Sequence, residues 1–149
     1  SARNKQLLRF CLVSGEKAHL VLPHIAMGSA LSEMELPLPG TEPNAFIIVC
    51  SVEEPHASTY IDLGISVQSM LLQAVEIGLG GICIGAFDKQ EVKESLALPY
   101  EPLLVVAIGK PKEKIKLVEI HEGDNKNYWR DESGTHYVTK IALDELMLK

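Results

Sequence analysis

The chain has 149 residues, which is enough for one domain with a hydrophobic core and too few for a second complete domain. Hydrophobic residues make up 46% of the chain and charged residues 23%, a balance that argues against disorder. The formal net charge of −6 argues against general nucleic-acid binding, because such binding needs a basic face that neutralises phosphates. No apolar run approaches the roughly 20 residues of a membrane span, so we expect neither a membrane nor a nucleic-acid partner.

The three cysteines, Cys11, Cys50 and Cys83, each lie in an apolar run, and no Cys-x-x-Cys pair occurs. This pattern is typical of reduced core cysteines in a cytoplasmic protein. No secretory signal peptide is recognisable, which agrees with a cytoplasmic location. The chain begins Ser-Ala-Arg-Asn without an initiator methionine, which suggests that a natural beginning has been removed.

The first elements in chain order are a strand, a helix, a loop and a second strand. Residues 7–13 form a short apolar run that predicts a strand. Residues 16–31 carry an apolar stripe at helical spacing, although Pro23 weakens the middle. Residues 32–44 contain four prolines or glycines and predict an irregular loop. Residues 45–52 are apolar on both faces, as expected for a central strand.

The clearest helix follows, with an apolar stripe that recurs at steps of three and four residues. Its members are Leu63, Val67, Met70, Leu71, Ala74 and Ile77. Thr59, followed three residues later by Asp62, predicts a capping box at the start of this helix. Gly78 predicts its end, because a residue without a Cβ easily turns left-handed.

Two further strands are expected on either side of a short helix. Residues 82–87 are the third strand candidate. A helix begins near Asp88 and is ended by Pro99, and residues 103–108 then form a fourth buried strand. Gly109 closes that strand.

The remainder of the chain has little periodicity before residues 135–139, a candidate strand, and residues 143–148. Lysines alternate at positions 110, 112, 114 and 116, which favours a solvated edge strand, with phosphate contact as the alternative. A long extension of this kind on a small domain often embraces another subunit.

The alternation of strands and helices makes a doubly wound α/β sheet the default interpretation. The pattern alone leaves an α+β arrangement with mixed strand directions open.

No self-sufficient catalytic group is visible in the sequence. The glycines at 78, 80 and 81 follow a helix and precede a strand, the reverse of a dinucleotide-binding loop. The histidines have no metal-ligand spacing, and no Gly-x-Ser-x-Gly motif occurs. We therefore expect no metal site, and an enzyme of this kind usually takes its chemistry from a cofactor.

Three segments of the sequence resemble the nitroreductase family of FMN-dependent oxidoreductases. Residues 1–6, Ser-Ala-Arg-Asn-Lys-Gln, resemble the family's Pro-Ser-x-x-Asn-x-Gln-Pro-Trp segment before a strand. Residues 62–74 and 78–87 resemble its buried helix, Gly-Leu-Gly stretch, strand and flavin-contacting turn. Residues 128–131 and 136–140 resemble a C-terminal stretch of some short bacterial members.

This resemblance implies an α+β fold with a mixed central sheet surrounded by helices, and it overrules the doubly wound default. It implies one domain over residues 1–149, dimeric, with an exchanged C-terminal arm and two FMN molecules at the interface. The family's first helix, with its Arg-Arg-Ser-type motif, is absent, so the domain is N-terminally incomplete relative to the family. Leu7-Leu8 replaces the family's Pro-Trp, and Thr139 replaces a common proline.

The resemblance also assigns cofactor-binding residues, while no side chain is expected to act as an essential acid or base. In the family, the positions that match the N-terminal residues contact flavin, often across the subunit interface. In the turn after the third strand, a main-chain N–H of the family faces flavin N5. Near the C-terminus, a basic residue of the family lies close to the FMN phosphate. The FMN-binding positions are Ser1, Arg3, Asn4, Cys83, Ile84, Gly85, Ala86 and Lys140.

The function implied is transfer of hydride from NAD(P)H through FMN to a nitroaromatic, quinone or related small-molecule acceptor. One alternative is a non-catalytic or weakly FMN-binding dimer of the same fold, because the missing helix removes a phosphate contact. Another is a relative that acts on flavin or on a halogenated aromatic.

Overall fold

The computed structural model describes residues 1–28 and 36–148. The predicted helix over residues 16–31 and the predicted loop over residues 32–44 fall partly outside these ranges. The chain divides into two compact units, residues 1–27 with 36–111 and residues 28–35 with 112–149. Each unit is described separately below.

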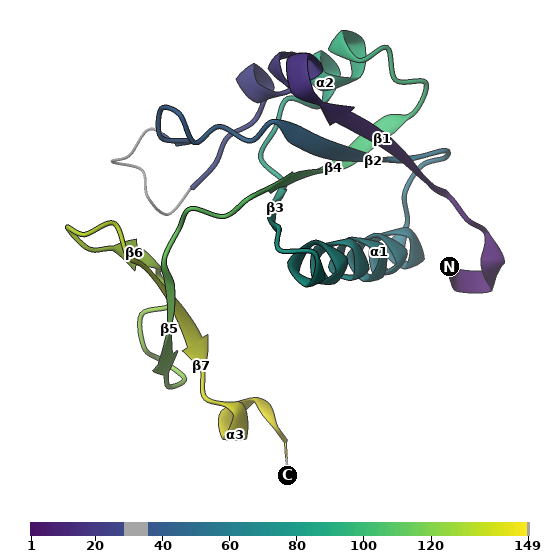
Figure 1. Ribbon diagram of the computed structural model, residues 1–149. Coiled ribbons are helices and arrows are strands. Elements are labelled where there is room, and N and C mark those ends of the chain that lie inside the picture. Colours follow the sequence, from purple (N-terminus) through teal and green to yellow (C-terminus); the bar gives the residue numbers. More distant parts are fainter. Residues whose placement is uncertain (29–35, 149) are drawn as a thin grey trace. The chain divides into compact units, whose positions relative to one another are not determined.

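The first unit contains a four-stranded sheet in which every neighbouring pair is antiparallel (Figure 1). The strands are β1 (Leu8–Ser14), β2 (Ala45–Ser51), β3 (Gly80–Ile84) and β4 (Glu101–Gly109), in the order β1-β2-β4-β3. The central strands β2 and β4 are the two continuous apolar runs, and they are buried on both faces, as their composition predicts.

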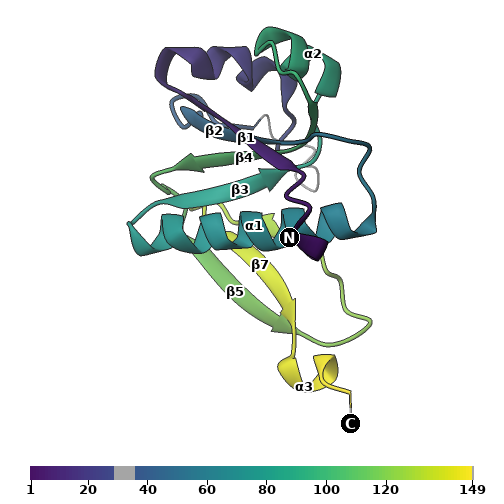
Figure 2. The same cartoon turned by 90° about the vertical axis from the view of Figure 1, so that its right-hand side faces the viewer.

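Helices cover both faces of this sheet. The long helix α1 (Ala57–Glu76) packs on one face, as both views show (Figures 1 and 2). The 3₁₀ helices η2 (Gly15–Leu20) and η3 (Leu22–His24) and helix α2 (Lys89–Ser95) cover the other. A short 3₁₀ helix, η1 (Ala2–Asn4), precedes β1.

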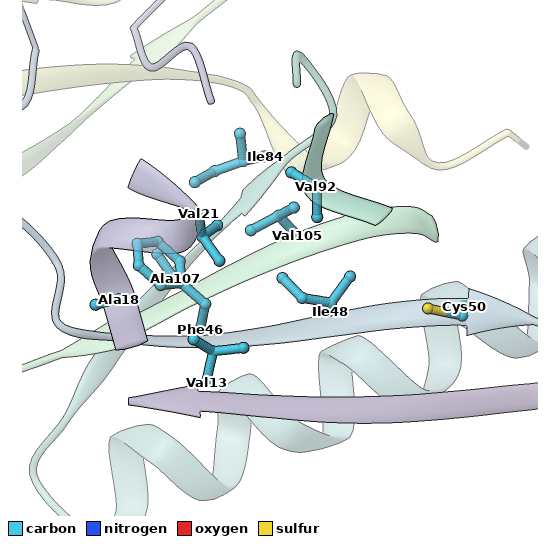
Figure 3. Packing of buried hydrophobic residues seen from close by; sticks show 10 residues of the cluster. All are labelled: Val13, Ala18, Val21, Phe46, Ile48, Cys50, Ile84, Val92, Val105 and Ala107. Carbon is cyan, nitrogen blue, oxygen red and sulfur yellow. The ribbon is translucent and has the colours of Figure 1, made fainter. Parts of the chain in front are cut away.

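Successive residues of β2 contribute to different halves of the core. Phe46 and Ile48 are fully buried among the side chains of the 3₁₀ helices and α2 (Figure 3). Val49 is buried on the other face, against Leu63 and Val67 of α1. This period of two is the geometric consequence of the pleated strand.

Two helix predictions need correction. Residues 15–24 form 3₁₀ turns, η2 and η3, in place of the first part of an α-helix. Pro23 lacks an N–H and cannot donate a bond to the preceding turn, which agrees with the break in regular structure. Helix α1 is capped by His56 and not by Thr59, which is the third helical residue and accepts a bond from the backbone N of His56 at 3.3 Å.

The apolar stripe predicted for α1 is correct at most positions. Leu63, Val67 and Ala74 are buried, whereas Ile77 is 64% exposed. Gly78 ends the helix with a φ of 78°, the left-handed conformation expected of a glycine at that place.

The second unit is a three-stranded sheet in the order β5-β7-β6. Strand β5 (Ile115–Ile120) runs parallel to β7 (His136–Ile141), and β6 (Trp129–Arg130) runs antiparallel to it. Helix α3 (Leu143–Leu146) follows β7. The candidate strand over residues 135–139 is confirmed, while β5 was expected only as an edge strand around the alternating lysines.

The α+β class is confirmed, and the doubly wound default is wrong. The larger sheet has no parallel pair among the described strands, and the mixed directions occur in the smaller sheet. Within the described residues, no helix is both long enough and apolar enough to cross a membrane.

Candidate functional site

The first group of expected cofactor residues lies in a compact N-terminal hook, which we define as residues 1–6. Its backbone is left-handed at Arg3 (φ 51°), Asn4 (φ 53°) and Gln6 (φ 52°). Residues with a Cβ adopt this conformation only when other contacts compensate for the steric cost. Hydrogen bonds supply those contacts: the backbone N of Asn4 donates to the carbonyl of Ser1 at 3.0 Å, and the backbone N of Gln6 donates to Ser1 Oγ at 3.0 Å.

The hook lies against α1 (Figures 1 and 2). It borders a pocket of about 340 Å³. The pocket combines the hook, the start of β1 and one side of α1. Its lining residues are Ser1, Gln6, Leu7, Leu8, Arg9, Phe10, Asp62, Ile65 and Ser66. Only Ser1 of these was expected at the site. The polar residues of α1 that face the pocket repeat at helical spacing, but the sequence does not show that the hook folds onto them.

The second group lies where β3 ends, in a segment that we call the β3 turn, residues 83–86. The side chain of Ile84 is only 3% exposed and belongs to the core (Figure 3). Cys83, Gly85 and Ala86 are exposed. A Cβ built on Gly85 would have no heavy atom within 4 Å. The turn therefore offers an open stretch of main chain beside one anchored side chain.

Neighbouring backbone fixes the far side of the β3 turn. The backbone N of Ala26 donates to the carbonyl of Ala86 at 2.8 Å, and Ile25 pairs with Phe87 in an isolated antiparallel bridge. The backbone N of Asp88 donates to the carbonyl of His24 at 2.8 Å. Asp88 then caps α2 by accepting from the backbone N of Glu91 at 3.0 Å. The turn is thus held between η3 and α2 in a defined conformation.

Within one chain the hook and the β3 turn do not meet. Strands β1 and β3 form opposite edges of the sheet, three strand spacings apart, which corresponds to about 14 Å. Ile84 stands opposite Val105 in the middle of β4, whereas Leu8 stands opposite Ser51 at the end of β2. A single chain therefore holds the two groups of expected cofactor residues apart, as two candidate half-sites.

Lys140 belongs to the second unit. It lies in β7, is exposed, and stands opposite Glu119 of the parallel strand β5. Its expected place near an FMN phosphate remains a prediction.

The cysteines differ in their surroundings. Cys50 is buried, as expected, and burial is the main cause that raises its pKa to about 11. Cys83 was expected in the core but is exposed; it lies on β3, an edge strand of the sheet. Partial burial of its thiol still raises the Cys83 pKa, so the group is neutral at neutral pH. Over residues 1–28 and 36–148, no three His, Cys, Asp or Glu side chains gather as metal ligands.

The sequence pattern of the Nitroreductase family matches residues 1–110 of this chain. The chain belongs to this family. The matched range contains the hook and the β3 turn, and most of the second unit lies beyond it.

Solved structures of family proteins have the same fold. A nitroreductase family protein from Clostridium novyi NT is 26% identical, with a TM-score of 0.59, over 75% of this chain and 66% of its own. An oxidoreductase containing FMN is 23% identical, with a TM-score of 0.57, over 74% of this chain and 59% of its own. A Bacteroides thetaiotaomicron protein is 23% identical, with a TM-score of 0.58, over 94% of this chain and 77% of its own.

This chain thus spans about two thirds or less of the first two of these structures. No curated protein matches it in sequence.

Proposed function

We propose that the protein is an FMN-dependent oxidoreductase that uses NAD(P)H to reduce a nitroaromatic, quinone or related acceptor. The observation that carries the proposal is the β3 turn, an exposed and firmly held stretch of main chain inside the range that matches the Nitroreductase family. A structural neighbour of this chain is described as an oxidoreductase containing FMN, which supports the choice of cofactor.

The geometry of the β3 turn fits a flat ring. Gly85 has open space where a side chain would stand, so a planar group can approach its backbone closely. Ile84 is buried in the core and anchors the turn, while the neighbouring residues Gly85 and Ala86 are exposed. A main-chain N–H in this segment can donate a hydrogen bond to the ring without adding a group that titrates.

The hook supplies the polar contacts of the second half-site. Ser1, Arg3 and Asn4 are exposed, and the fixed backbone around them holds their side chains in one small region. The guanidinium of Arg3 offers donors that suit phosphate or ribityl oxygens, and Lys140 offers a further cation. Since the two half-sites are apart in one chain, we propose that each cofactor is bound by the hook of one protomer and the β3 turn of its partner.

An FMN held by the β3 turn and the hook would supply the hydride-transfer chemistry between NAD(P)H and the second substrate. The residues of this chain orient the ring, exclude water and leave the acid–base chemistry to the substrates. Cys83 is the only ionisable side chain in the β3 turn, and its raised pKa keeps it as a neutral thiol that neither donates nor takes a proton readily near pH 7. Both substrates then use one pocket in turn, which implies ping-pong kinetics.

The proposed dimer rests on the exposed apolar side chains of α1 and β1. Ile61, Ile65 and Leu72 recur on one side of α1 and are 61%, 63% and 61% exposed. On the neighbouring edge strand, Phe10 and Leu12 are 52% and 72% exposed. Apolar side chains gathered in this way on a helix and an adjacent strand are typical of an interface between subunits. We propose a homodimer that buries this surface.

The cofactor proposal is tested on the complete chain by its absorbance spectrum and by titration with FMN. We expect a flavin spectrum or, for protein prepared without flavin, a melting temperature that rises with added FMN. NADH or NADPH oxidation should then depend on a nitroaromatic or quinone acceptor. A colourless protein whose melting temperature does not change with excess FMN would overturn the proposal. FMN binding without turnover would favour a non-catalytic flavin protein.

The dimer proposal is tested by light scattering after gel filtration. Leu72→Glu places a charge in the proposed interface but on the surface of a single chain, so it should yield a folded monomer. Leu38→Glu is the control, since Leu38 is 41% exposed and belongs to the segment before β2, outside α1 and β1. Equal masses for Leu72→Glu and the unaltered chain would show that this face is not the interface.

A further inference from the structure

The start of β1 shows how the hook is joined to the rest of the protein. The carbonyl of Leu7 accepts a bond from the backbone N of Val52 at 3.0 Å and so points into the sheet. Carbonyls alternate in direction along an extended strand, so those of Gln6 and Leu8 are directed toward the free edge of β1. Arg9 binds both of them: its Nη1 lies 2.8 Å from each carbonyl oxygen.

Gln6 connects this guanidinium to the hook. Its carbonyl accepts from Arg9, its backbone N donates to Ser1 Oγ at 3.0 Å, and its side-chain Nε2 donates to Asn4 Oδ1 at 2.9 Å. Three polar groups of one left-handed residue thus tie Ser1 and Asn4 to Arg9. Lys5 of the hook also forms an ion pair with Glu53, which follows β2; the two atoms are 3.6 Å apart, the side chains are about half exposed, and such pairs add little.

We propose that Arg9, acting through Gln6, is a positioning residue that holds Ser1, Arg3 and Asn4 in the arrangement needed to bind FMN. The inference rests on the proposed function for the identity of the ligand. Its structural half, that Arg9 maintains the hook, stands on the hydrogen bonds alone. A flexible six-residue segment would lose conformational freedom on binding, and a pre-formed hook avoids most of that loss.

The test compares flavin binding by Arg9→Met, Arg9→Lys and the control Lys17→Met in the complete chain. Arg9→Met keeps an unbranched aliphatic stem but removes both hydrogen bonds, whereas Lys17→Met removes the same charge from an exposed position in η2, outside the hook and the β3 turn. Affinity is measured by quenching of flavin fluorescence, with FMN and with riboflavin, which lacks the phosphate. The melting temperature without flavin shows whether each variant folds.

We expect Arg9→Met to weaken the binding of FMN and of riboflavin by the same factor, about tenfold or more, while the melting temperature stays unchanged. Arg9→Lys should recover part of the loss, and Lys17→Met should change affinity by less than about fivefold. A loss for FMN but not for riboflavin would mean that Arg9 binds the phosphate directly, and the proposal would be wrong. Equal affinities for Arg9→Met and Lys17→Met would also overturn it.

A second measurement separates this inference from the proposed function. In the flavin-free chain, amide hydrogen exchange at Gln6 should be faster in Arg9→Met than in the unaltered protein, and unchanged in Lys17→Met. Unchanged exchange in Arg9→Met would refute the positioning role whatever the flavin result. If the unaltered chain binds no flavin, the proposed function fails, and the exchange rates still decide whether Arg9 holds the hook.

Discussion

Replacing Gly81 by alanine should destabilise the first unit, because α1 packs directly onto the backbone of β3 at this residue. An added Cβ would lie 2.6 Å from Leu71 Cδ2, 2.7 Å from Ile108 Cδ1 and 2.9 Å from the carbonyl oxygen of Ala107. The two side-chain ends can rotate away, but the carbonyl belongs to the central strand β4 and cannot.

Overpacking of this kind costs about 1–3 kcal/mol, and the stiffer alanine backbone returns about 0.5–1 kcal/mol. A net loss of about 1–2 kcal/mol corresponds to a melting temperature lower by about 2–8 °C for a chain of this size. Urea unfolding followed by circular dichroism, at one protein concentration, measures the change. Gly85→Ala is the control, since its Cβ meets nothing within 4 Å, and it should stay within about 0.5 kcal/mol of the parent. If Gly81→Ala is as stable as Gly85→Ala, α1 does not pack on β3 as described.

Three other changes test separate parts of the structure. Gly85→Ala should leave the free energy of unfolding unchanged but weaken FMN binding in a fluorescence titration, because its methyl group would stand where the ring approaches. An unchanged affinity would show that the ring does not bind at Gly85. Phe46→Ala should lower the free energy of unfolding, measured in urea, by about 3–5 kcal/mol, since this ring is fully buried between β2 and the 3₁₀ helices. A loss no larger than that caused by truncating an exposed side chain would contradict its place in the core. His121 Nδ1 lies 2.7 Å from Glu145 Oε1, and this hydrogen bond is the main cause that raises the His121 pKa, so Glu145→Gln should return that pKa toward 6.5 in an NMR titration. The stabilising effect of His121 is complete below pH 6.5 and is lost as the pH rises through the raised His121 pKa. The pKa of Glu145 is lowered chiefly by the backbone N–H of Glu122. The stabilising effect of Glu145 is therefore present above pH 4.5 and is lost as the pH falls through the lowered pKa.

The elements that could be predicted from sequence are those in which burial determines the pattern. Strands β2 and β4 are continuous apolar runs because both of their faces are covered, and α1 carries its core stripe at helical spacing. Strand β5 was less evident because Ile115 and Leu117 are exposed and alternate with charged residues, so no buried face marks it. The start of α1 was misplaced because histidine is an uncommon N-cap, whereas Thr59 is a common one.

The candidate site was only partly predictable for a similar reason. The resemblance identified the hook and the β3 turn, but not that they lie on opposite edges of the sheet, since strand order depends on long-range pairing. The backbone is left-handed at Arg3, Asn4 and Gln6, but no glycine at these positions indicates that conformation in the sequence. It depends on hydrogen bonds between residues two to five positions apart that no sequence motif marks, and the contribution of Arg9 was therefore not visible in the sequence.

The guanidinium of Arg9 also has a bearing on how the protein stays in solution. An unpaired strand at the edge of a sheet exposes a row of hydrogen-bond acceptors and donors with which another polypeptide can pair. Such pairing is a common route to aggregates. At the beginning of β1 the outward acceptors are already engaged by the protein's own side chain. A foreign strand would have to displace a cation from two oxygens before it gained its first bond there, so the segment resists templated self-association as well as supporting its neighbours.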